Sequence, residues 1–148
     1  MKQILFAIFV SLLIIPTCRK NNTGTDGITG SWKLIQVYDK STATTNFPPA
    51  GSTTDIVLTF LNTNKFAGHT LVNILTDGSF TLNGNKINFG IFSMTKVGED
   101  PWGESFLTVL NACLLQSTTP CNPSTMSIQG KLMKITTALR YDITLEKI

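Results

Sequence analysis

The residues best suited to catalysis in this sequence are its single histidine, His69, and Ser105, which follows a Gly-Glu pair. A general base needs a partner that orients it and a nucleophile within reach, and no spacing around His69 supplies either. Ser105 lacks the second glycine of a nucleophile elbow and falls within a predicted helix. We therefore expect a protein that is not an enzyme, in which His69 is a structural or surface residue of a strand.

Neither a metal site nor a cofactor site is predicted. The sequence contains no His-x-x-x-His or Cys-x-x-Cys pair and no glycine-rich phosphate loop. Glu99, Asp100 and Glu104 form an acidic group, but acidic residues are also favoured at the start of a helix by its macrodipole. We interpret the three as residues of a helix N-terminus rather than as a carboxylate cluster.

The beginning of the chain resembles a bacterial lipoprotein signal. Lys2 supplies a positive charge, and residues 4–15 form an apolar run that is too short to span a bilayer comfortably. The residues that lead to Cys18 resemble a lipobox, in which a small residue precedes a cysteine that is lipidated, although Thr17 is larger than usual. We expect residues 1–17 to be a signal peptide and Cys18 to carry lipid such as palmitate; ordinary secretion is the alternative.

Such an anchor would hold the protein on a membrane of the bacterial cell envelope. The expected location is the outer membrane, with the protein facing the periplasm. Residues 18–29 are polar apart from one large apolar side chain, so they are predicted to form a flexible tether. The remaining residues, 30–148, suffice for one domain with one core.

Cys113 and Cys121 remain as an even pair once Cys18 is assigned to lipid. An exported protein lies in a compartment that permits disulfides, so we predict a bond between them. Closing so short a loop would stabilise the fold by roughly 2 to 3 kcal/mol. The alternative is two independent thiols, with Cys113 a small apolar residue on a helix face.

Periodicity and composition predict an all-β fold, a mainly antiparallel, barrel-like sheet with one amphipathic helix. The expected strands are residues 30–38, 56–61, 66–73, 80–82, 87–91, 126–128, 132–136 and 141–146. Asp77-Gly78 and Asn83-Gly84-Asn85 are typical of the tight turns that join antiparallel strands. Asp100 as N-cap and Pro101 as first residue predict the helix, at about 100–115.

Eight aromatic residues fall on these elements, where they can fill a core or line a ligand cavity. Filling the core is the more common use in a small barrel. The eight are Trp32, Phe60, Phe66, Phe80, Phe89, Phe92, Trp102 and Tyr141.

The order of the elements and several residues resemble the META domain, a family that includes heat-inducible envelope lipoproteins. The residues that carry the resemblance are Gly30-Ser31-Trp32, Phe66-Ala67-Gly68, Asn73, Phe80, Ile87, Thr95, Phe106 to Leu110, Leu132 and Leu145. Many such domains have Gly-Cys-Asn where this chain has Leu71-Val72-Asn73. A lipocalin-like domain, which also opens with a Gly-x-Trp strand, is the alternative; a helix before the final hairpin favours META.

The resemblance implies a barrel-like sheet but little chemistry. We expect a non-enzymatic envelope lipoprotein that supports membrane integrity or stress tolerance by contacting another envelope protein. The alternative is a lipocalin-like module that binds a small apolar ligand or lipid. Nucleic acid is excluded as a partner because the net charge is only +3 and the basic residues are scattered along the chain.

Overall fold

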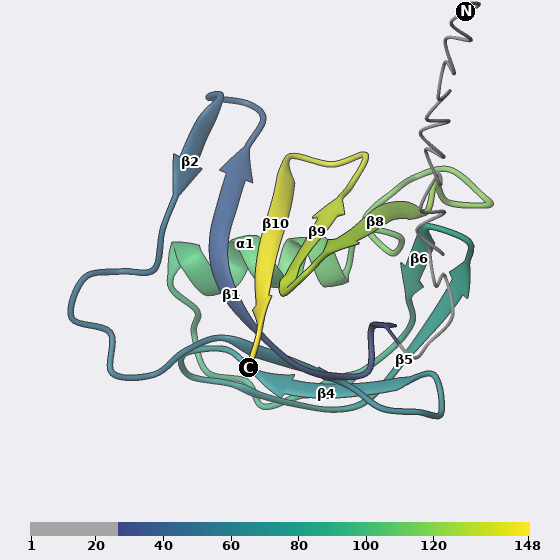
Figure 1. The fold of residues 1–148 in the computed structure, drawn as a ribbon. Coiled ribbons are helices and arrows are strands. Elements are labelled where there is room, and N and C mark those ends of the chain that lie inside the picture. Colours follow the sequence, from purple (N-terminus) through teal and green to yellow (C-terminus); the bar gives the residue numbers. More distant parts are fainter. Residues whose placement is uncertain (1–26) are drawn as a thin grey trace, which may run out of the picture.

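The computed structural model describes residues 27–148, which form one antiparallel β-barrel with a single helix (Figure 1). The predicted all-β fold class is confirmed. The elements are β1 (Gly30–Asp39), β2 (Thr44–Asn46), β3 (Val57–Phe60), β4 (Lys65–His69), β5 (Ile74–Asn83), β6 (Lys86–Phe89), β7 (Ser93–Met94), α1 (Pro101–Leu110), β8 (Ser124–Gln129), β9 (Leu132–Thr136) and β10 (Tyr141–Lys147).

Eight of the strands close on themselves in the order β1, β3, β4, β5, β6, β8, β9 and β10, with β10 paired back to β1. Apart from the short strands β2 and β7, each strand therefore lies beside its neighbour in the sequence. This is the arrangement of up-and-down barrels, which remove free sheet edges by closing. Strand β2 extends the sheet beyond β3 by pairing with the last residues of β1.

The predicted turn at Asp77-Gly78 is wrong, because both residues lie inside the continuous strand β5. One extra residue of β5 bulges against β4, and Asp77 takes a φ of 56° there. Gly78 is required at this point because a Cβ would lie 2.5 Å from the ring of Phe66. The actual hairpin turn lies at residues 70–73, where the amide of Thr70 donates to the carbonyl of Asn73. The predicted strand 66–73 therefore ends earlier, at residue 69.

The predicted turn at Asn83-Gly84-Asn85 is confirmed. Asn83 pairs with Lys86 across the β5–β6 hairpin, and Gly84 between them has a φ of 59°. A left-handed backbone of this kind is what a two-residue hairpin loop requires.

Helix α1 begins as predicted and ends early. Asp100 is its N-cap, since the Oδ1 atom accepts from the amide of Gly103 at 2.7 Å, and Pro101 occupies the first turn. The helix stops at Leu110 rather than near residue 115, and turns follow. Asn111 is the C-cap, and both its backbone amide and its side-chain nitrogen donate to the carbonyl of Leu107, at 2.9 and 3.0 Å.

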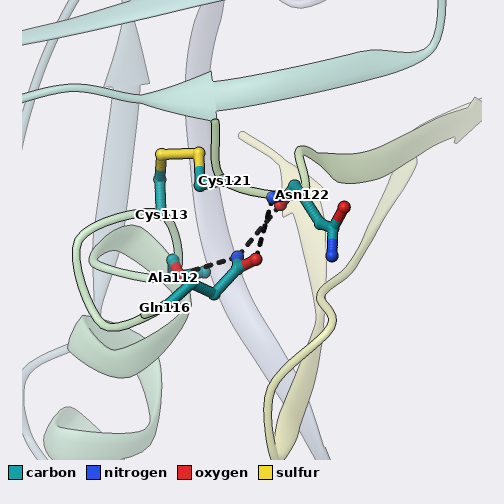
Figure 2. The surroundings of a disulfide bond; sticks show 5 residues. All are labelled: Ala112, Cys113, Gln116, Cys121 and Asn122. Atoms are coloured by element: carbon teal, nitrogen blue, oxygen red, sulfur yellow. Dashed lines mark hydrogen bonds between the residues drawn. A yellow bond between two sulfur atoms is a disulfide. The ribbon is translucent and has the colours of Figure 1, made fainter. Parts of the chain in front are cut away.

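The predicted disulfide between Cys113 and Cys121 is present and closes the loop that leads from α1 to β8 (Figure 2). Gln116 holds the same loop from within. Its side-chain nitrogen donates to the carbonyls of Ala112 and Asn122, and its oxygen accepts from the amide of Asn122 at 2.8 Å (Figure 2).

The barrel interior is filled by apolar side chains. The ring of Phe60 meets that of Phe80 edge-on at 5.1 Å, and the ring of Phe66 meets that of Phe89 edge-on at 5.4 Å. Edge-to-face contacts of this kind are the favoured packing of aromatic rings. The interior aromatic residues therefore belong to the core.

The folded domain begins before Gly30, within the segment 18–29 that the sequence predicts to be a tether. Ile28 is buried in the core, and its carbonyl accepts from the indole of Trp32 at 2.6 Å. One apolar residue in a polar stretch was therefore part of the core, because the barrel provides an apolar site beside Trp32. The predicted signal peptide and Cys18 lie outside the described residues, and within residues 27–148 no helix is long and apolar enough to cross a membrane.

A candidate binding cleft at the mouth of the barrel

A cleft of about 400 Å³ opens between the β1–β2 hairpin, the start of β10 and the first turns of α1. Figure 1 shows these elements together at one side of the barrel. The lining residues are Val37, Asp39, Asn46, Phe47, Pro49, Asp100, Pro101, Trp102, Ser105, Arg140 and Tyr141.

Side chains alternate between the two faces of a strand, and this alternation explains why these residues line the same cleft. Val37 and Asp39 alternate with the outward-facing Tyr38 on β1, and Asn46 lies opposite Val37 on β2. Tyr141 pairs with Asp39 across the seam that closes the barrel. Helix α1 packs against β10 and β1, so it covers part of the barrel mouth and leaves the cleft beside it.

An ion pair between Asp39 and Arg140 forms one wall of the cleft. The Nε of Arg140 lies 2.9 and 3.0 Å from the two carboxylate oxygens, and Nη2 also donates to Oδ2. The amide and hydroxyl of Ser41 donate to Oδ1. These hydrogen bonds, above all those from Arg140, hold the pKa of Asp39 well below its usual range, and the pair raises the pKa of Arg140. Both groups are therefore charged across the physiological range.

The two partners are buried to very different extents. The side chain of Asp39 is 7% exposed, whereas that of Arg140 is 52% exposed and lies over the ring of Tyr141, with 4.9 Å from the guanidinium carbon to the ring centre. The buried carboxylate of Asp39 thus holds the guanidinium of Arg140 in a fixed orientation, with its other side exposed to solvent. Among the described residues, none accepts a hydrogen bond from Nη1, so this nitrogen is free to meet a ligand.

A second ion pair fixes the turn that carries Arg140. Lys40 donates to the carbonyl of Thr137 at 2.6 Å and lies 2.9 Å from Oδ1 of Asp142. The same carboxylate accepts from the amide of Thr137, and the amide of Lys40 donates to the carbonyl of Arg140. These contacts tie the start of β10 to the end of β1, so the guanidinium is presented from a rigid part of the barrel.

The helix side of the cleft is positioned by a buried polar cluster. Asn73 is buried, and its side-chain nitrogen donates to the Oε1 of Glu99 and to the carbonyl of Val97. The hydroxyl of Thr95 and the amide of Val97 donate to its oxygen. The segment before α1 is thereby tied to the 70–73 turn, which sets where Asp100 and the helix enter the cleft.

The acidic residues predicted at the helix start have separate roles. Asp100 caps the helix as expected, whereas Glu99 bonds to Thr70 and Asn73 instead. Its other oxygen lies against Gly103, where a Cβ would approach to 2.1 Å, so Gly103 makes room for this carboxylate. Within residues 27–148, no group of three histidine, cysteine or acidic side chains gathers to hold a metal.

The structure separates His69 from Ser105. His69 is half-buried on β4, with Nδ1 3.1 Å from the carbonyl of Thr70, and it does not line the cleft. Ser105 does line the cleft, but its hydroxyl donates to the carbonyl of Pro101 within the helix. Of the eight aromatic residues, Trp102 and Tyr141 also reach the cleft.

Sequence reasoning missed the residues that define this cleft, Asp39, Arg140 and Phe47. The ion pair joins residues that are 101 positions apart in the sequence, so no local spacing of residues could predict it. Phe47 lies in a segment, residues 40–54, whose composition is mainly polar and typical of a flexible loop. The one usable signal was an aromatic side chain next to a Pro-Pro pair, because proline restricts the residue before it to extended backbone.

Comparison with known proteins shows the fold and no more. No family model matches the chain, and no curated protein matches it significantly. A protein from Burkholderia xenovorans, solved by NMR, is 20% identical with a TM-score of 0.59, and the match covers 86% of this chain and 88% of that one. A DUF4847 family protein from Bacteroides vulgatus, solved by crystallography, is 11% identical with a TM-score of 0.55, with 81% and 93% covered.

Proposed function

We propose that this protein is a small-molecule-binding barrel held in the bacterial cell envelope, with its binding site at the barrel mouth. The observation that carries the proposal is the cleft between β1, β2, β10 and α1. Its volume of about 400 Å³ lies in the range of small-ligand sites. It also combines apolar walls with a few oriented polar groups, the composition by which such sites fix a ligand.

The mouth is a better candidate than the interior. The rings of Phe60, Phe66, Phe80 and Phe89 pack against one another inside the barrel, so a ligand there would have to displace core contacts. At the mouth, Phe47 is 67% exposed and Arg140 is half exposed, so a ligand would add contacts without breaking any of the core.

The cell-envelope part of the proposal rests on the sequence. Its supports are the lipobox-like segment at Cys18 and a disulfide within the domain, which suits an oxidising compartment. Lipid on Cys18 would keep the cleft close to a membrane without using any residue of the barrel. Replacing Cys18 with Ala should abolish incorporation of labelled palmitate and release the protein from the membrane fraction. Retention of both would refute the anchor.

Native mass spectrometry of the full-length protein, purified gently from its membrane in detergent, tests the binding site. We expect an added mass that disappears on denaturation. Asn46→Trp should abolish it by filling the cleft from β2. Thr45→Trp is the matched control, because Thr45 is the neighbouring exposed residue on the same strand and points away from the cleft.

Loss of the added mass in Asn46→Trp and its retention in Thr45→Trp would support a site at the mouth. An added mass that survives both substitutions would place the ligand elsewhere and refute the site. A bare protein in every preparation would refute the binding function itself and favour contact with another envelope protein.

A further inference from the structure

The geometry points to a neutral polyhydroxyl compound, a sugar in its simplest form, as the ligand of the cleft at the barrel mouth. This inference rests on the proposed binding function and specifies its ligand class. Three properties of the lining carry it: its balance of charge, its free hydrogen-bonding atoms and an exposed aromatic ring.

The charges of the lining disfavour an ionic ligand. The charge of Arg140, the only cation in the lining, is already balanced by the buried carboxylate of Asp39, to which Nε and Nη2 donate, so an anion would meet a neutral pair. A second carboxylate, Asp100, would repel an anion further. A cation would meet the guanidinium of Arg140, while Asp39 is neutralised and Asp100 faces the positive end of a helix dipole. A neutral ligand avoids both conflicts.

The free polar atoms of the lining match hydroxyl groups. Among the described residues, no protein group bonds to Nη1 of Arg140, to the side-chain amide of Asn46 or to Oδ2 of Asp100. These atoms include donors and acceptors, and a hydroxyl can serve both because it donates one hydrogen bond and accepts others. A sugar presents several hydroxyls in fixed directions and can satisfy the three groups together.

A hydrocarbon chain suits these walls less well. Covering Arg140, Asn46 and Asp100 with methylene groups would remove their hydration and return no hydrogen bond, which is unfavourable for each polar group left unpaired. This cost argues against the small apolar ligand that the sequence suggested for a lipocalin-like module.

Phe47 supplies the apolar surface that a sugar also needs. Its side chain is 67% exposed and follows β2 directly at the edge of the cleft, beside Pro49 in the lining. The C–H groups on one face of a pyranose ring pack against an aromatic face while the hydroxyls at the rim reach polar atoms. The lining of the cleft includes both surfaces, the ring of Phe47 and the polar Asp39–Arg140 pair.

Saturation-transfer NMR on the full-length protein tests the ligand class. The probes are the methyl glycosides of glucose, galactose and mannose, together with chitobiose, glucuronate, glucosamine and palmitate. We expect transfer to at least one neutral sugar and none to palmitate. For the sugar that responds, Phe47→Ala should weaken binding about tenfold, as loss of an aromatic anchor does. Ile91→Ala, at an apolar residue that is also mostly exposed but lies outside the cleft, should not change it.

The outcomes separate the ligand class from the binding function. Neutral-sugar binding that is lost in Asn46→Trp and kept in Thr45→Trp supports the inference. Palmitate or a charged sugar that binds in the same cleft-dependent way, with no response from neutral sugars, overturns the inference and leaves the binding function standing. Sugar binding that Asn46→Trp leaves intact also overturns it, because the sugar then binds elsewhere. No response from any probe overturns the inference, and native mass spectra then decide whether the binding function fails too.

Discussion

The interior of the barrel and its mouth use the same kinds of residue in opposite ways. Inside, Phe60 and Phe66 are almost fully buried and meet neighbouring rings edge-on. At the mouth, Phe47 is mostly exposed, and a half-exposed guanidinium lies over Tyr141. The interior side chains therefore contribute most of the stability, whereas the side chains at the mouth stay exposed after folding and can contact a ligand. Aromatic content alone says nothing about binding until exposure is known.

The largest expected effect on stability comes from removing an aromatic ring from the interior. Phe66→Ala should destabilise the protein by about 3 to 5 kcal/mol, because it removes a buried ring and leaves a cavity over Gly78. Phe47→Ala should change stability by less than about 0.5 kcal/mol. Urea unfolding followed by tryptophan fluorescence measures both. Similar losses for the two variants would break the comparison between interior and mouth.

The disulfide should have a smaller effect that leaves the mouth intact. Replacing Cys113 and Cys121 with Ser should lower the free energy of unfolding by about 2 to 3 kcal/mol, because the bond restricts the unfolded chain over a separation of eight residues. Neither cysteine lines the cleft, so ligand binding should persist. Wild-type protein in reductant is the control and should unfold at the same urea concentration as the double variant. An unchanged midpoint would show that the bond contributes nothing to stability.

The smallest expected effect concerns the ion pair at the mouth, because a partly exposed pair contributes less than a buried one. Arg140 lowers the pKa of Asp39 in the folded protein, so the stabilisation is complete above the unfolded pKa of about 4 and is lost as the pH falls further. Arg140→Met should therefore lower the free energy of unfolding at neutral pH. Below about pH 4, the stability of this variant should decrease less steeply with falling pH than that of the wild type.

Thermal unfolding between neutral and strongly acidic pH measures this difference. Lys33→Met is the matched control, since Lys33 pairs with Asp55 at 3.0 Å on the surface and lies outside the cleft. Its pH profile should follow that of the wild type. If Arg140→Met leaves the dependence of the unfolding temperature on pH unchanged, the Asp39–Arg140 pair contributes no more to stability than the surface pair between Lys33 and Asp55.

Much of the barrel could be predicted from local signals. Alternation of apolar residues located most of the strands, Asn83-Gly84-Asn85 located a hairpin, and Asp100-Pro101 located the helix start. The Cys113–Cys121 bond was predicted because these two cysteines remain as an even pair once Cys18 is assigned to lipid. Each of these signals depends on residues that are close in sequence or on a simple count, so no knowledge of tertiary packing was needed.

Local signals failed where a distant residue decided the outcome. Asp77-Gly78 has the composition of a turn, yet it forms a bulge because the ring of Phe66 on the neighbouring strand occupies the space above Gly78. Ile28 reads as part of a polar tether, but the barrel buries it beside Trp32. In both cases the neighbour belongs to another segment, so local composition pointed to the wrong structure.

The sequence by itself determined most of the strands and the helix start, because propensity, periodicity and capping act over a few residues, and it determined one disulfide by the count of cysteines. Only the tertiary structure decided the candidate site. Asp39 and Arg140 meet because β10 pairs with β1, and this closure brings together residues 101 positions apart. Phe47 and Asp100 join them only when β2 and α1 pack at the same mouth. A site assembled by closing a barrel depends on contacts across the whole chain, which no local pattern in the sequence encodes.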